Sequence, residues 1–156
     1  MTRPTTNCKM DELHMDLALE LAREAERAGE VPVGAVVVLG GRVIGRGRNS
    51  PIALHDPTAH AEVLALREAS QAIGNYRLEG ATLYATLEPC VMCAGALVVS
   101  RVSRLVYGAR DLRFGGVRSK FHLADAEVLN HRLEIVEGVR GAECAELMQR
   151  FFATKR

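Results

Sequence analysis

The chain has 156 residues, of which 48% are hydrophobic and 25% are charged, and its formal net charge is +1. This length fits a single domain over residues 1–156, no secretory signal is visible, and the composition excludes a disordered or fibrous protein. Since no apolar run approaches the ~20 residues that cross a bilayer, we expect a cytoplasmic protein with no membrane partner.

The first predicted element is a helix over residues 11–28. Apolar side chains recur there every four residues, beginning with Leu13 and Leu17, which places one apolar stripe along the helix. Gly29 is a typical residue to end such a helix. Residues 1–10 show no such pattern, and we expect them to form a flexible N-terminus.

A β-hairpin is predicted next. Residues 33–39 are an apolar run rich in β-branched side chains, and residues 42–46 supply a partner strand. Gly40 and Gly41 between them form a two-residue turn.

Strands and helices alternate in the rest of the chain. Strands are expected over 81–86, 104–108 and 133–137, and helices over 59–69, 89–99 and 142–152. This order favours an α/β sandwich around a central sheet. Residues 110–129 show no clear period, and connections of that length inside a compact domain are often functional.

Two short motifs carry residues that bind metals. His60-Ala61-Glu62 lies at the predicted start of one helix, and Pro89-Cys90-Val91-Met92-Cys93 lies at the start of the next. Cysteines separated by two residues share a helix face, and the helix N-terminus lowers the pKa of a thiol. Two thiolates and one imidazole balance the charge of zinc and leave a fourth position for water, as in catalytic zinc sites. Cys8 and Cys144 have no such partners.

Glu62 is the candidate catalytic residue. It lies two residues from His60, close enough to reach a water molecule on the metal without being a ligand. Because zinc lowers the pKa of its water to about 7, Glu62 could accept the proton of that water and pass it to a substrate.

A structural zinc site is the alternative interpretation. His55 and His60 have a spacing seen in sites with two histidines and two cysteines. On that interpretation the metal would have four protein ligands and no chemistry. Pro57 disfavours a shared helical face for the two histidines, and a chain of this length does not need metal to fold.

Charge is unevenly distributed along the chain. Residues 11–30 hold seven acidic side chains against two arginines, and residues 101–120 hold six basic side chains against Asp111 alone. A local basic surface can face a polyanion. The alternative for residues 101–120 is an ordinary solvated loop.

At the level of motifs, the chain resembles the zinc nucleobase deaminases, and among them the tRNA adenosine deaminases. The likeness runs from about Leu13 to Phe152. It is carried by residues 31–35 (VPVGA), 56–62 (DPTAHAE), 75–78 (NYRL), 88–96 (EPCVMCAGA) and 108–111 (GARD).

The resemblance implies a cytidine-deaminase-like fold, which is a three-layer α/β/α sandwich with a central mixed five-stranded sheet. It implies one Zn²⁺ per subunit, a homodimer, and deamination of the wobble adenosine in the anticodon stem-loop of tRNA. Asn49 matches the base-contacting asparagine of the family, and Asp111 and Asn130 match positions near the RNA. Arg110 and Arg113, in the basic segment, are candidates to meet phosphates.

One stretch departs from the family pattern. Relatives usually have glycine where Arg118 stands in residues 115–119 (GGVRS). If that position needs a positive φ, an arginine would be strained there and the loop would differ.

Two other functions remain open at this point. A deaminase of a free base or nucleoside, such as guanine or cytosine, would use the same zinc chemistry, although a free base has no phosphate for the basic segment to meet. A non-catalytic zinc-stabilised binding module would have no use for Glu62.

Overall fold

The computed structural model describes residues 5–155, with side chains from residue 8 onward. Five strands form one sheet in the order β2-β1-β3-β4-β5. The strands are β1 (Gly34–Leu39), β2 (Arg42–Arg48), β3 (Thr82–Leu87), β4 (Arg104–Ala109) and β5 (Glu134–Glu137). β1 pairs antiparallel with β2 and β3, whereas β3, β4 and β5 run parallel. The predicted mixed five-stranded sheet is confirmed.

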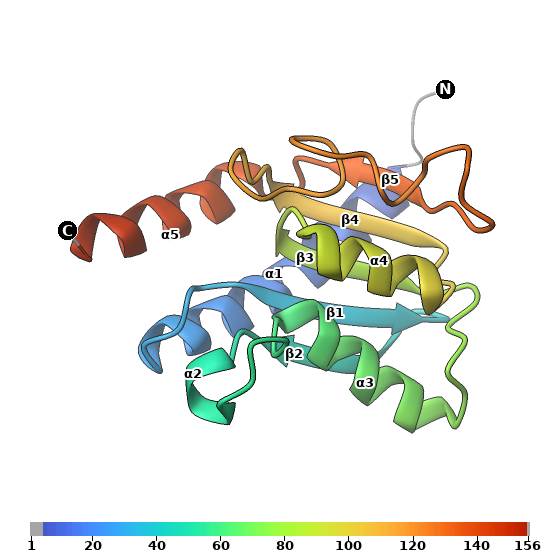
Figure 1. The fold of residues 1–156 in the computed structure, drawn as a ribbon, viewed down its shortest axis with the longest axis horizontal. Helices are drawn as coiled ribbons and strands as arrows, with labels where there is room; N and C mark the ends of the chain where they lie inside the picture. Colours follow the sequence, from blue (N-terminus) through green and yellow to red (C-terminus); the bar gives the residue numbers. More distant parts are fainter. Residues whose placement is uncertain (1–4, 156) are drawn as a thin grey trace.

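Helices cover both faces of the sheet (Figure 1). α1 (Thr5–Arg27) and α5 (Gly141–Thr154) pack on one face, and α3 (Ala61–Ile73) and α4 (Val91–Val99) pack on the other. A short helix, α2 (Pro51–Leu54), lies in the connection between β2 and α3. The three-layer α/β/α sandwich is therefore confirmed.

The alternation of side chains along the strands divides the core between the two faces. Val36 of β1 pairs with Tyr84 of β3, and Tyr84 pairs with Val106 of β4; all three are buried beneath α1 and α5. Their neighbours, such as Leu83 and Leu105, are buried beneath α3 and α4. Since successive strand residues point to opposite faces, both faces of the central strands must be apolar.

A buried ion pair joins α1 to the sheet. Asp11, 1% exposed, accepts hydrogen bonds from the guanidinium of Arg104 at 2.8 and 2.7 Å and from the hydroxyl of Tyr84 at 2.7 Å. This network lies on the face of the sheet opposite α3 and α4.

The structure differs from the predicted elements mainly at their ends. α1 begins at Thr5, so residues 5–10 are helical; the first four residues of the predicted flexible N-terminus lie outside the described part of the chain. α2 was not predicted. The buried Glu30 accepts hydrogen bonds from the backbone N–H groups of Ile52 and Ala53 at 3.2 and 2.9 Å, which is a contact that local sequence cannot reveal.

None of the helices formed by residues 5–155 has the length and apolarity that a membrane crossing needs.

Candidate active site

Three potential metal ligands meet where α3 and α4 begin. His60 is the N-cap residue of α3, and Cys90 is the N-cap residue of α4. Nδ1 of His60 lies 3.6 Å from Sγ of Cys90 and 3.5 Å from Sγ of Cys93. All three ligand atoms lie within 4.8 Å of one another. The two motifs, thirty residues apart in sequence, therefore form one cluster.

The spacing of these atoms fits a tetrahedral metal ion. Tetrahedral zinc places sulfur and nitrogen ligands about 3.5 Å apart, because its bonds to them measure about 2.3 and 2.0 Å. The thiol of Cys90 is also prepared to ionise: hydrogen bonds from Cys93 and His60 lower its pKa to about 4. Metals bind thiolates rather than thiols; the pKa of the neighbouring Cys93 thiol is raised by its hydrogen bond to Cys90 and by burial. Two sulfur atoms and one imidazole are a donor set that suits a zinc-type ion.

His55 does not join this cluster. It is exposed and forms the C-cap of α2 in a left-handed conformation, with φ of 49°. Among residues 5–155, the group that could hold a metal consists of His60, Cys90 and Cys93. The site with two histidines and two cysteines is therefore not formed, and the cluster offers three ligand atoms.

Glu62 lies in the first turn of α3 and is 4% exposed. Burial raises the pKa of its carboxyl group to about 7, and a hydrogen bond links that group to Cys93. A carboxyl group with a pKa near neutrality can both accept and donate a proton at physiological pH. The transfer of protons by Glu62 stays a prediction.

A cavity of about 1150 Å³ opens beside the cluster. Its lining includes His60, Cys90 and Glu62, and three of the predicted substrate contacts, Asn49, Asp111 and Arg113. It is large enough for a nucleobase with attached groups. Further residues of the lining are Phe114, Phe121, Met148 and Phe152.

Asn49 is oriented by the start of α3. Its side-chain oxygen accepts a hydrogen bond from the backbone N–H of Ala61 at 2.8 Å. The amide nitrogen is then the group that can donate to an acceptor on a substrate. As a residue directly after β2, Asn49 both ends the strand and lines the cavity.

Asp111 and Arg113 lie in one turn at the cavity. Oδ1 of Asp111 accepts hydrogen bonds from the backbone N–H groups of Arg113 and Phe114, both at 3.1 Å. By contrast, Arg110 and Asn130 are exposed and are not part of the cavity lining. A substrate contact by either residue stays a prediction.

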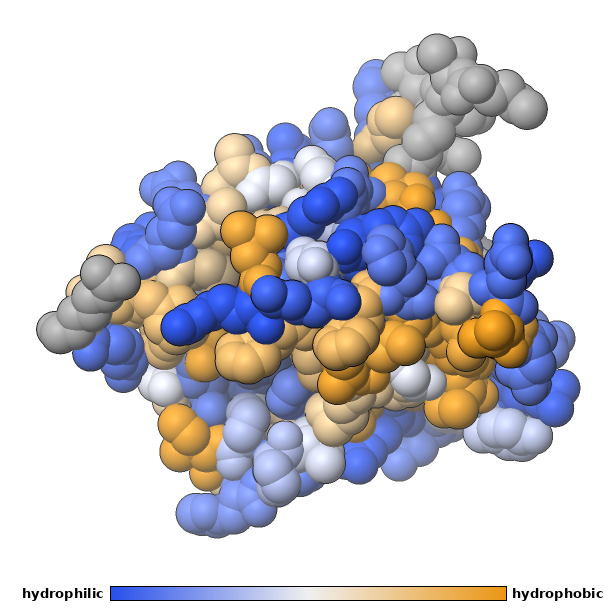
Figure 2. Space-filling model, turned by 45° about the horizontal axis from the view of Figure 1, so that its top comes forward, coloured by the Kyte–Doolittle hydropathy of each residue, from blue (hydrophilic) through white to orange (hydrophobic). Residues whose placement is uncertain are grey.

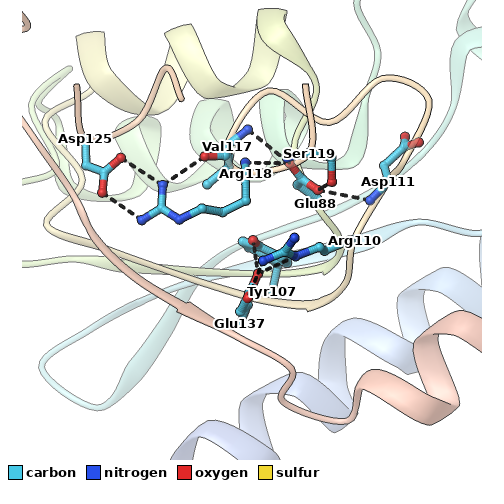
Figure 3. Close-up of polar contacts among 9 residues, drawn as sticks. All are labelled: Glu88, Tyr107, Arg110, Asp111, Val117, Arg118, Ser119, Asp125 and Glu137. Atoms are coloured by element: carbon cyan, nitrogen blue, oxygen red, sulfur yellow. Dashed lines mark hydrogen bonds and ion pairs between the residues drawn. The ribbon is translucent and has the colours of Figure 1, made fainter. Parts of the chain in front are cut away.

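Ion pairs occupy half of the basic side chains of residues 101–120. Besides Arg104 with Asp11, Arg110 pairs with Glu137 at 2.9 and 3.0 Å (Figure 3). Arg118 pairs with Asp125 at 2.9 and 2.8 Å. Arg113 and Lys120 are exposed and belong to none of these pairs. The surface is therefore less positive than the sequence alone suggests.

Arg118 occupies its glycine-type position without backbone strain. Among the described residues, the non-glycine residues with positive φ are His55, Arg101 and Arg140. The condition under which Arg118 would be strained is therefore not met. Its side chain donates to Asp125 and to the carbonyl oxygen of Val117 at 2.9 Å (Figure 3).

Sequence reasoning missed one buried acid, Glu88, which directly precedes Pro89 and Cys90. It is 2% exposed and accepts hydrogen bonds from several groups of residues 111–119. Burial alone would raise the pKa of its carboxyl group, but the hydrogen bonds from Ser119, Arg118 and Asp111 outweigh burial and lower it. The signal available in sequence was an acidic residue at the end of a buried strand.

Comparison with known proteins gives a consistent result. The family model of the MafB19-like deaminases matches residues 10–156. The chain is 51% identical to the tRNA-specific adenosine deaminase of Haemophilus influenzae, over 95% of this chain and 86% of that protein. It is 47% identical to the enzyme of the same name from Bacillus subtilis, over 94% and 91% of the two chains.

Solved structures are similar as well. One is from a study of tRNA deaminases that edit adenosine to inosine at the wobble position of transfer RNA; it is 46% identical, with a TM-score of 0.83, over 86% of this chain and 97% of that one. A guanine deaminase from Bacillus subtilis is 32% identical, with a TM-score of 0.64, over 89% and 93%. The sequence is thus more similar to the tRNA enzymes than to the free-base enzyme.

Proposed function

Because this chain belongs to the MafB19-like deaminase family, and within it to the tRNA-specific adenosine deaminases, we propose that it converts adenosine to inosine at the wobble position of a tRNA anticodon. The carrying observation is the cluster of His60, Cys90 and Cys93 beside the buried Glu62 in one cavity. A binding module with structural zinc explains neither the open coordination position nor a buried proton-transfer group.

The metal we propose is one Zn²⁺ per subunit, held by His60, Cys90 and Cys93. Support comes from the donor set and from the 3.5 and 3.6 Å spacing of the ligand atoms. When bound, zinc acts as a Lewis acid that lowers the pKa of water to about 7.

Glu62 moves the protons of the reaction. Its carboxylate takes a proton from the attacking water and delivers it to the ring nitrogen beside the carbon under attack. The second proton passes by the same carboxyl group to the amine, which leaves as ammonia, and the carbon keeps the oxygen. Adenosine and water thereby become inosine and ammonia.

Asn49, Asp111 and Arg113 would hold the nucleotide. The amide nitrogen of Asn49 would donate to the base, since its oxygen already accepts the N–H of Ala61, and Asp111 fixes the turn that carries Arg113 and Phe114. Exposed aromatic side chains at the cavity, Phe114, Phe121 and Phe152, offer faces on which unstacked bases can stack.

We also propose a homodimer that acts in the cytoplasm, where tRNA is found. Large exposed apolar side chains support an interaction surface: Leu112, Phe114 and Val128 are 73%, 66% and 94% exposed. On the face shown in Figure 2, apolar side chains lie beside strongly hydrophilic ones. Such a mixture suits both a protein partner and RNA.

The position of the adenosine tests the proposed function. A base stacked in a duplex cannot present its amine to a buried site, so the substrate base must be unstacked from a loop. We expect inosine in a stem-loop with adenosine at the wobble position, and none in a matched stem-loop whose only adenosine is paired in the stem. Nucleoside chromatography of digested RNA measures both. Equal deamination of the two RNAs would contradict loop recognition.

The unpaired basic side chains should determine the salt dependence of RNA binding. Replacing Arg113 and Lys120 by glutamine should raise KM for the stem-loop and reduce the salt slope of binding by about one for each phosphate that is no longer neutralised. The control is Arg42→Gln, which should leave the slope unchanged. Arg42 is exposed and is the first residue of β2, whereas Asn49 follows the last. An unaltered slope in the double variant would make Arg113 and Lys120 ordinary surface residues.

A further inference from the structure

A single buried carboxylate connects the metal-binding segment to the loop that lines the cavity. Glu88 lies between the end of β3 and Cys90, the N-cap residue of α4. The loop in question, residues 111–119, follows β4 and carries Asp111, Arg113 and Phe114 into the cavity wall. Figure 3 shows the carboxylate of Glu88 between Asp111 on one side and Val117, Arg118 and Ser119 on the other.

Both ends of this loop donate to the carboxylate. One oxygen, Oε2, accepts the backbone N–H groups of Val117, Arg118 and Ser119 at 3.1, 2.8 and 2.9 Å. The other oxygen, Oε1, accepts the backbone N–H of Asp111 at 3.0 Å and the hydroxyl of Ser119. Five donors therefore converge on one side chain. An ionised carboxylate suits this position because it only accepts hydrogen bonds, through about four lone-pair sites on two oxygens that neighbouring donors can share.

The backbone of the loop presses directly against this side chain. A Cβ atom at Gly115 would lie within 3.0 Å of Cδ and of both carboxylate oxygens of Glu88. The N–H of Gly116 donates to the carbonyl oxygen of Pro89 at 2.8 Å. Since real Cβ atoms do not approach so closely, only glycine at position 115 permits this packing.

We propose that Glu88 is a positioning residue, which holds the 111–119 loop in the conformation that binds substrate beside the metal cluster. The kinetic part of this inference rests on the proposed function; the structural part does not. If the hydrogen bonds to Glu88 were absent, Asp111, Arg113 and Phe114 would lose their fixed place relative to Cys90. The loop would then adopt several conformations, and the apparent affinity for substrate would fall because only a fraction of them could bind it.

Glu88→Gln is the sharpest test. A glutamine has one oxygen that accepts and one nitrogen that donates. With the nitrogen at the Oε2 position, three backbone N–H groups would face a donor. With the nitrogen at the Oε1 position, only the N–H of Asp111 is left without an acceptor, because the hydroxyl of Ser119 can rotate and accept instead. The variant should therefore keep the fold and release the loop at Asp111.

Hydrogen–deuterium exchange and kinetics supply the two measurements on the zinc-loaded protein. In Glu88→Gln we expect faster amide exchange in residues 111–119 and unchanged zinc content. We also expect KM for the wobble-adenosine stem-loop to rise about tenfold, with kcat changed less than about threefold, because the loop supplies binding rather than proton transfer. The control is Asp11→Asn, a buried carboxylate on the opposite face of the sheet, which should lower stability without this exchange pattern or a rise in KM.

A second variant, Gly115→Ala, tests the same inference if the Glu88→Gln protein does not fold. Gly115→Ala leaves every donor in place but pushes the loop away from the carboxylate, so the same exchange and KM changes are expected. Gly95→Ala, in α4, adds a methyl group that meets no atom within 4 Å, and it should change neither.

Wild-type exchange in residues 111–119, or faster exchange with an unchanged KM, would overturn the inference. A wild-type protein inactive on the stem-loop would instead refute the proposed function, and the exchange data would still test the hydrogen bonds to Glu88.

Discussion

Glu62→Ala is expected to keep its full zinc content and to lower kcat on the stem-loop by about a thousandfold, within the range that a positioned general acid–base contributes. Glu62 is buried beside the proposed ligands His60, Cys90 and Cys93 but is not part of the group that could hold a metal. Its removal should therefore leave the metal in place and abolish the transfer of protons from water to the base and to the departing amine.

The control for Glu62→Ala is a variant that keeps the shape of the side chain. Glu62→Gln preserves the volume of the side chain and one accepting oxygen but cannot take up and release a proton, so it should be as inactive as the alanine variant. Metal analysis and single-turnover kinetics on the same samples separate loss of zinc from loss of catalysis. Substantial turnover by a zinc-loaded variant would remove Glu62 from the mechanism.

The order of elements in the sequence was sufficient to predict an α/β sandwich around a central sheet, and the family resemblance implied its three layers and five strands. The runs at 33–39 and 81–86 are buried on both faces of the sheet, as expected for central strands that helices cover on either side. Element ends were less predictable, since they depend on distant contacts. α2 is held by Glu30, and the N-terminal part of α1 includes Asp11, which pairs with Arg104 across 93 positions of sequence.

The cluster of His60, Cys90 and Cys93 and its neighbour Glu62 were predictable because metal-binding chemistry imposes short, regular spacings. Cys90 and Cys93 share a helix start, and His60 and Glu62 share another. The pairing of Arg110 with Glu137 and of Arg118 with Asp125 was not predictable, since opposite charges distant in sequence are indistinguishable from free surface charges until the chain folds. The same holds for Glu88, whose partners all come from a loop without periodicity.

Free adenosine, cytidine and guanine are expected to be poorer substrates than the stem-loop by about a thousandfold or more in kcat/KM, because correct positioning supplies much of an enzymatic rate. The stem and the flanking nucleotides can contact Arg113 and the aromatic side chains of the cavity, whereas a free base can use only the groups around the cluster. The 32% identity to a guanine deaminase makes this comparison necessary, since both enzymes would use the same proton transfers.

The most direct test offers the purified zinc-loaded protein each of these substrates separately and measures ammonia release together with the deaminated product by chromatography. We expect inosine at the wobble position of the stem-loop, with free guanine, cytidine and adenosine converted at least about a thousandfold less efficiently. Efficient turnover of free guanine or cytidine, with the stem-loop left untouched, would contradict the proposed function.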